Sequence, residues 1–240
     1  MVVGGALSTR SAAEPLAGLL APSFTVFAYD RRGRGDSGDT PPYAVEREVE
    51  DIQALVEDAG GSAFAFGHSS GGALALEAAA HILGITKLAL YEPPFIVDSS
   101  RPPLPDDYVD RLTELASTGR RGDAIEDFMT TGVLVPAEAV ASMRDESSWP
   151  AMEALAHTLA YDVMVLGDTM SGAPLPSDRW ASVTIPTLVF DGGASPPWLG
   201  NAAQGLVDVL PDAQRRTLEG QTHEVDPTLL APVLEEFFAG

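Results

Sequence analysis

The sequence GHSSG at residues 67–71 places a serine, Ser69, between two glycines. An apolar run precedes it and a helical pattern follows it, so Ser69 would lie on a tight turn from a strand into a helix. Glycines flank such a turn for a steric reason, because a Cβ there would collide with neighbouring backbone. The amides of the helix would face the negative charge that develops when the serine attacks an acyl group. The motif therefore predicts that Ser69 is a nucleophile.

His223 is the predicted general base. It lies in a loop after the last predicted strand. A histidine that titrates near neutrality can take the proton of a serine hydroxyl and return it to the leaving group. The other three histidines lack such a context: His68 is expected to pack against or orient the turn, and His81 and His157 are expected to be structural.

Several segments resemble those of the α/β-hydrolases. Residues 29–38, YDRRGRGDSG, resemble the D-x-R-G-x-G-x-S loop of that family, and residues 186–190, PTLVF, resemble the strand before its usual acid. Residues 220–223, GQTH, resemble the segment that carries its histidine. The resemblance covers the chain outside residues 93–182 and implies a triad in the order Ser, acid, His.

The acid of the triad is where the sequence departs from the family. The position at which the family usually has Asp is Ser195 here. We favour Glu92, just beyond the strand that follows the nucleophile helix, because some relatives take their acid from that strand end. Asp191 is the alternative acid. A Ser–His dyad, an acid at Asp226, and a site with no acid and little activity stay open.

An oxyanion hole needs two backbone N–H groups aimed at the tetrahedral oxygen. One is expected from Ser70, directly after the nucleophile. By the resemblance the other comes from Ala6, because Gly4-Gly5-Ala6 stands where the family has His-Gly-x.

The elements that must position these residues alternate between strand and helix, which predicts an α/β fold: a doubly wound, mostly parallel sheet of the α/β-hydrolase kind. Residues 1–92 and 183–240 are expected to form this core. Residues 93–182 break the alternation with paired prolines and helical patterns, and are expected to form a helical cap insertion. Its aromatic residues are expected to pack in the core more than to line a pocket. The expected strands are 2–6, 24–29, 62–67, 87–91, 183–190 and 214–218, and the expected core helices are 12–20, 44–59, 71–83, 198–210 and 227–238.

Composition excludes several kinds of site. The chain has 240 residues, with 14 basic and 35 acidic side chains and a formal net charge of −21. That charge argues against nucleic acid as a partner, since phosphate contacts need clustered Lys and Arg. The chain has no cysteine, and its four histidines are dispersed. We therefore expect no disulfide, no metal site and no cofactor.

The sequence also predicts a location and an oligomeric state. No apolar run is long enough to span a membrane and residues 1–10 do not resemble a signal peptide, so we expect a cytoplasmic protein that does not associate with membranes. The antiparallel strand pair that α/β-hydrolases usually carry before their third strand does not precede residue 2. Residues 24–29 would then form an exposed edge strand, which favours a homodimer or poor solubility.

The predicted function is that of a serine hydrolase that cleaves a neutral small-molecule ester, or a related acyl bond, through a Ser–His–acid triad and an acyl-enzyme. Two alternatives remain. A cofactor-free lyase or perhydrolase could use the same triad, and a degenerate hydrolase fold could bind a small molecule without turnover.

Overall fold

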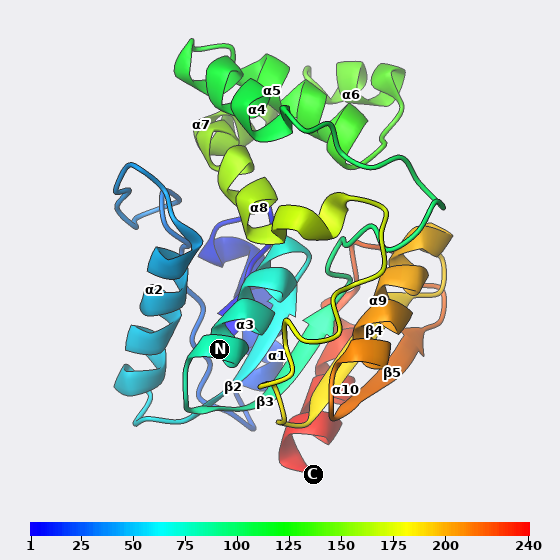
Figure 1. The fold of residues 1–240 in the computed structure, drawn as a ribbon. Coiled ribbons are helices and arrows are strands. Elements are labelled where there is room, and N and C mark those ends of the chain that lie inside the picture. Colours follow the sequence, from blue (N-terminus) through cyan, green and yellow to red (C-terminus); the bar gives the residue numbers. More distant parts are fainter.

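A five-stranded parallel sheet forms the centre of the protein, which we describe from a computed structural model of all 240 residues. The strands lie in the sheet in the same order as in the chain (Figure 1). Apolar side chains dominate the central strands because both faces of a parallel sheet are covered. The strands are β1 Val2–Val3, β2 Ala63–His68, β3 Ile85–Tyr91, β4 Thr187–Gly192 and β5 Ala213–Leu218.

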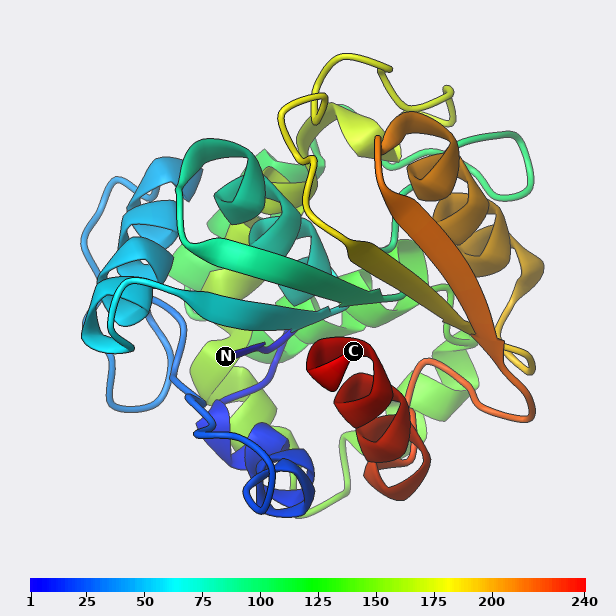
Figure 2. The same ribbon diagram turned by 90° about the horizontal axis from the view of Figure 1, so that it is seen from below.

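Helices cover both faces of this sheet (Figure 2). One face carries α1 and α10, whose leucines pack with Phe66 and Phe190 in a shared apolar cluster. The other face carries α2, α3 and α9, which meet in a larger cluster around Leu74 and Val189. The bounds of these helices are α1 Glu14–Leu20, preceded by the 3-10 turn Arg10–Ala13, α2 Val45–Asp58, α3 Ser70–His81, α9 Pro197–Val209 and α10 Pro227–Ala239.

Between β3 and β4 the chain forms only helices and loops. The helices lie beyond one end of the sheet, and the loop after Met170 runs back beside α3 to the start of β4 (Figure 1). We call residues 93–182 the insertion. It has its own apolar cluster, built around Leu112, Ile125 and Leu159. The parallel α/β sheet with a helical insertion predicted from the sequence is thus confirmed. The helices of the insertion are α4 Tyr108–Ser117, α5 Arg121–Asp127, the π turn Phe128–Gly132, α6 Ala137–Met143, α7 Trp149–Leu155, the 3-10 turn Ala156–Thr158, α8 Leu159–Leu166 and the 3-10 turn Gly167–Met170.

Four of the six aromatic residues of the insertion are buried, and the other two, Phe128 and Tyr161, are half-buried. Phe95 stacks on Trp180 with ring centroids 5.6 Å apart, and both are buried in the core. Tyr108 and Trp149 belong to the apolar cluster of the insertion. None of the helices has the length and apolar character that crossing a bilayer requires.

The prediction of a strand at residues 24–29 was wrong, because the segment forms no full strand. Only Ala28 makes a bridge, to Val2, in the parallel sense. A strand needs a partner ladder of comparable length, and its neighbour β1 has just two residues. The rest of the segment packs by its side chains: Phe24 contacts Phe64 and Phe238 edge-on. The homodimer expected from this edge stays a prediction.

Candidate active site

Ser69 occupies the sharp turn between β2 and α3. Its backbone lies in the left-handed region, at φ 57° and ψ −129°, which a residue with a side chain adopts only under strain. The turn can close this tightly because its neighbours are glycines. A Cβ on Gly67 would lie 2.5 Å from the carbonyl oxygen of Gly71, and a Cβ on Gly71 would overlap the carbonyl of Gly4. Both glycines are therefore at positions where a side chain would collide with neighbouring backbone, as the sequence predicted.

Glu92 and His223 form a hydrogen bond at the carboxyl end of the sheet. The Nδ1–H group of His223 donates to Oε2 of Glu92 at 2.7 Å, and the amide of Gly192 donates to Oε1 at 2.8 Å. The Glu92 side chain is fully buried. Because an ionised carboxylate only accepts hydrogen bonds, the proton of the neutral imidazole lies on Nδ1 and its Nε2 is a free base.

The other carboxylates considered from the sequence have different partners. Arg215 donates to both oxygens of Asp191, at 2.7 and 2.9 Å. Asp226 caps the N-terminus of α10 by accepting from the amide of Thr228 at 2.8 Å. Neither forms a hydrogen bond with His223, so of these three acids the structure brings only Glu92 to the imidazole.

Two further side chains hold the loop that carries His223. The hydroxyl of Tyr91 donates to the carbonyl of Thr222 at 2.6 Å, and Nε2 of His68 donates to the carbonyl of His223 at 2.9 Å. The His68 and His223 rings lie 4.8 Å apart, which places His223 beside the turn of Ser69. No hydrogen bond joins the Ser69 hydroxyl to His223, and catalytic hydrogen bonds commonly tighten only with substrate bound. His68 was expected to pack against or orient the turn, and its hydrogen bond to the carbonyl of His223 was not predicted.

His68 predicts a pH dependence of stability. Burial, reinforced by the nearby His223, lowers the pKa of His68 from 6.5 to about 4, against the opposing effects of its hydrogen bond to the His223 carbonyl and of the Glu92 charge. Between these two values the unfolded chain binds a proton that the folded chain does not, so stability falls as the pH drops from about 6.5 to about 4. At about 1.4 kcal/mol per pKa unit, His68 alone would cost up to about 3 kcal/mol.

Urea unfolding of the wild type and His68→Gln at a series of pH values measures this effect. The stability of the wild type relative to the variant should decrease by up to about 3 kcal/mol between pH 7 and pH 4. A difference that stays constant over this range would contradict a neutral His68 at this half-buried position.

The N-terminal loop after β1 lies against the nucleophile. A Cβ on Gly5 would approach the Cβ of Ser69 to 2.9 Å and its Oγ to 3.5 Å. The N–H group of Ala6 has no partner within the protein. Ser70 is the first residue of α3, whose opening amides have no intrahelical acceptor. The two residues expected to form an oxyanion hole thus lie on the two segments that flank Ser69.

Replacement of Gly5 by Ala should therefore impair catalysis more than folding. The added methyl group must push the loop or Ser69 aside, and a displacement of about 1 Å at a reacting centre can cost roughly 10²-fold in rate. We expect kcat/KM on an ester to fall by about that factor. Gly18→Ala, on the exposed face of α1 where a Cβ meets nothing within 4 Å, is the matched control and should retain activity. Equal activity of the two variants would contradict the placement of this loop.

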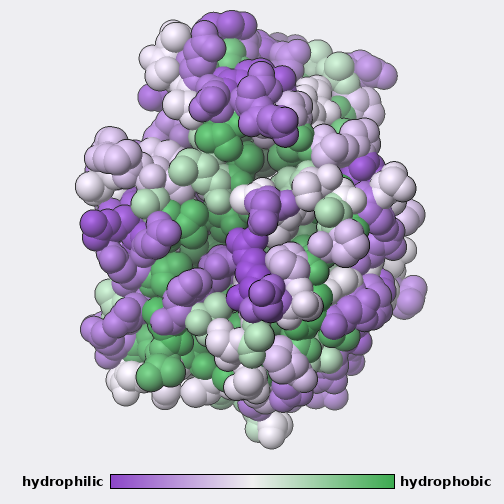
Figure 3. Space-filling view, in the orientation of Figure 1, coloured by the Kyte–Doolittle hydropathy of each residue, from purple (hydrophilic) through white to green (hydrophobic).

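The insertion lies beyond the same end of the sheet (Figure 1). In the space-filling view, hydrophilic residues cover its outer side, and hydrophobic residues gather beneath them where it meets the core (Figure 3). No cluster of three His, Cys, Asp or Glu side chains is placed to hold a metal ion. The candidate site is therefore a serine, a histidine and a carboxylate at the end of the sheet beyond which the helices of the insertion lie.

Comparisons with known proteins identify the family to which the fold belongs. Residues 2–234 match the model of the alpha/beta hydrolase family, and the chain belongs to that family. An alpha/beta hydrolase from Sphaerobacter thermophilus is 60% identical over 99% of this chain and 91% of its own, with a TM-score of 0.91.

More distant structures share the fold. A hydrolase from Pseudomonas aeruginosa is 20% identical, covering 100% of this chain and 89% of its own with a TM-score of 0.70. A marine microorganism esterase is 18% identical, covering 98% of this chain and 93% of its own with a TM-score of 0.67. A comparison with curated proteins finds no match.

Proposed function

We propose that this protein is a serine hydrolase that cleaves neutral small-molecule esters through an acyl-enzyme. The observation that carries the proposal is the hydrogen bond of 2.7 Å from the half-buried His223 to the fully buried Glu92, beside the strained turn of Ser69. A buried acid, an imidazole with a free Nε2 and a serine on such a turn are the parts that acyl transfer requires.

The reaction follows from these positions. Ser69 Oγ attacks the ester carbonyl while Nε2 of His223 accepts the hydroxyl proton, and Glu92 stabilises the imidazolium that forms. The N–H groups of Ala6 and Ser70 bind the oxyanion of the tetrahedral intermediate. Its collapse breaks the bond to the alkoxy group, which leaves as an alcohol with the proton from His223. A water molecule then attacks the acyl-enzyme, giving its proton to His223, and the second collapse releases the carboxylic acid and restores Ser69.

The charge of the protein and the cover of the site support a neutral substrate. A net charge of −21 repels anionic substrates from the surface, and the junction of insertion and core exposes hydrophobic residues (Figure 3). The esterase among the structural neighbours shares only the fold, but its name agrees with this substrate class.

Two assays on the wild type test the proposal. Hydrolysis of p-nitrophenyl esters of increasing acyl length measures turnover. A fluorophosphonate probe, followed by peptide mass analysis, reports whether an activated serine reacts. We expect hydrolysis of short or medium acyl chains and stoichiometric labelling of the peptide that contains Ser69.

Each other outcome contradicts the proposal in a defined way. Labelling of Ser69 without ester hydrolysis would point to a lyase or perhydrolase with the same nucleophile. Absence of both would indicate a binding protein with a degenerate site. Hydrolysis with labelling at another serine would refute the assignment of Ser69.

A further inference from the structure

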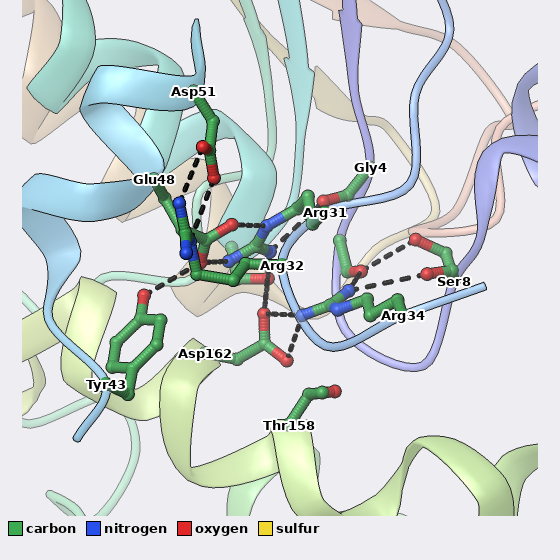
Figure 4. A network of polar contacts seen from close by, with 12 residues as sticks. Gly4, Ser8, Arg31, Arg32, Arg34, Tyr43, Glu48, Asp51, Thr158 and Asp162 are labelled. Atoms are coloured by element: carbon green, nitrogen blue, oxygen red, sulfur yellow. Dashed lines mark hydrogen bonds and ion pairs between the residues drawn. The ribbon is translucent and has the colours of Figure 1, made fainter. Parts of the chain in front are cut away.

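Four buried charges connect the insertion to the segments around Ser69 (Figure 4). Asp162, from α8, reaches between two arginines of the loop at residues 30–38. Its Oδ1 accepts from Nη1 of Arg31 and Nη2 of Arg34, each at 2.8 Å, and its Oδ2 also accepts from Arg34 at 2.8 Å. Arg31 in turn pairs with Glu48 of α2 at 2.7 Å. All four side chains are at most 2% exposed.

This network is electrically balanced and keeps Asp162 ionised. Burial by itself would raise the pKa of Asp162, but the charges of Arg34 and Arg31 and the hydroxyl of Ser70 hold it below its usual value. Buried ion pairs generally add little stability compared with apolar residues of the same volume. Their best-supported role is to fix one particular geometry. The geometry that Asp162 fixes is therefore informative.

Asp162 holds both segments that flank the nucleophile. On one side, the hydroxyl of Ser70 donates to its Oδ1 at 2.8 Å. On the other, Arg34, which Asp162 binds through both oxygens, donates from Nη1 to the carbonyl of Gly5. These are the two segments whose amides, at Ser70 and Ala6, would bind the oxyanion.

The contact of Arg34 with Gly5 bears directly on the amide of Ala6. The carbonyl of Gly5 and the N–H group of Ala6 belong to the same planar peptide, in which they point in opposite directions. A guanidinium that holds the carbonyl on one side therefore directs the N–H group to the other. The charge also polarises the peptide, which strengthens its N–H group as a donor.

We propose that Asp162 is a positioning residue for the oxyanion hole: through Arg34 and Ser70 it aligns the amides of Ala6 and Ser70. The position of α8 on the core therefore affects the rate of acyl transfer. The inference rests on the proposed hydrolase function. It also assigns a role to the insertion, which supplies the carboxylate that organises the core site.

The central experiment compares Asp162→Asn with the wild type. Asparagine keeps the shape of the side chain but loses the charge that orients Arg34. Because complete loss of one oxyanion donor costs about 10²–10³ in kcat, we expect misalignment to lower kcat by about 10- to 100-fold, with KM within about threefold of the wild type. Glu48→Gln is the matched control: it removes a buried carboxylate of the same network that contacts neither Ser70 nor Arg34. It should lose comparable stability and keep kcat within about threefold.

Inhibition by phenylboronic acid separates positioning from general destabilisation. Its boron accepts a lone pair of Ser69 Oγ while Nε2 of His223 takes the hydroxyl proton, which gives a tetrahedral boronate anion whose oxygen would occupy the oxyanion hole. In Asp162→Asn the inhibition constant should rise by about the same factor as kcat falls, whereas Glu48→Gln should leave it unchanged.

Three results would overturn the inference: wild-type kcat in Asp162→Asn, an unchanged boronate inhibition constant in that variant, or equal losses of kcat in Asp162→Asn and Glu48→Gln. If Asp162→Asn does not fold, the variant Ser70→Ala tests the proposal instead, because it keeps every charge of the network and the backbone amide of residue 70. It should lower kcat and weaken boronate binding by an equal factor of about 3 to 10, and wild-type values would refute the proposal. A wild type that neither hydrolyses esters nor binds the boronate would instead refute the proposed function.

Discussion

Ser69→Ala should reduce kcat on p-nitrophenyl esters by at least roughly 10⁴-fold, because no other group can form the acyl-enzyme. Alanine at this position has the same backbone strain as serine, at φ 57°, so the turn and the free energy of unfolding should change little. The fluorophosphonate label should be lost as well.

Ser195→Ala is the matched control for this experiment. Its hydroxyl is buried without a hydrogen-bond partner, near the same edge of the sheet, and it stands where the family usually has its acid. The variant should retain wild-type kcat and lose no stability, because it removes an unsatisfied polar group. Substantial residual hydrolysis in Ser69→Ala, or loss of activity in Ser195→Ala, would show that the nucleophile is misassigned.

Glu92→Gln should lower kcat by about 10³- to 10⁴-fold with KM little changed. The carboxylate of Glu92 accepts two donors, from His223 and Gly192. A glutamine amide has only one acceptor oxygen, so in either orientation its NH₂ group faces one of those donors. If it faces His223, the imidazole adopts the tautomer with the proton on Nε2 and can no longer act as a base. If it faces Gly192, a buried amide loses its partner and the end of the strand shifts.

Asp191→Asn provides the comparison for Glu92→Gln. Asp191 is also buried, but its partner is Arg215, so its replacement should lower the melting temperature and leave kcat within about threefold. Steady-state kinetics and thermal unfolding of the two variants together test the acid. A large loss of kcat in Asp191→Asn with an active Glu92→Gln would reverse the assignment.

The turn at Ser69 could be predicted from the sequence because most of its causes are local. A strand, two glycines at fixed spacing and the start of a helix lie within a few residues of one another, and the contacts that demand Gly67 are to Gly71 and Gly72. The requirement for Gly71 comes from a remote segment, because a Cβ there would overlap the carbonyls of Val3 and Gly4. The alternation of strands and helices could likewise be predicted from the sequence, since each element buries its own short apolar run. The segment at residues 24–29 has a strand-like pattern too, but whether it pairs depends on the length of β1, a remote partner.

The sequence favoured Glu92 as the acid through the family resemblance, but the positions of Glu92 and Asp191 in the strands do not distinguish them. Tyr91 of β3 lies opposite Phe190 of β4, so Glu92 and Asp191 are the next residues at the same level of the two strands and are equivalent by position. Glu92 and Asp191 differ in backbone conformation and in the side chains around them. Glu92 turns away at φ 46°, toward His223, whereas Asp191 continues along β4 opposite Thr217 and beside Arg215 of β5.

The sequence by itself was enough to identify the family and to predict the nucleophile and the order of the chemical groups, because the turn and the elements that carry them depend largely on steric rules that act between near neighbours. The tertiary structure alone decided which carboxylate meets His223 and which one binds the arginine that contacts Gly5. Asp162 and Arg31 are 131 residues apart, and Glu92 and His223 are equally distant in the chain. A pairing over such a separation is set by how the insertion packs on the core and by how the strands register in the sheet, since buried charges must find partners wherever the fold places them.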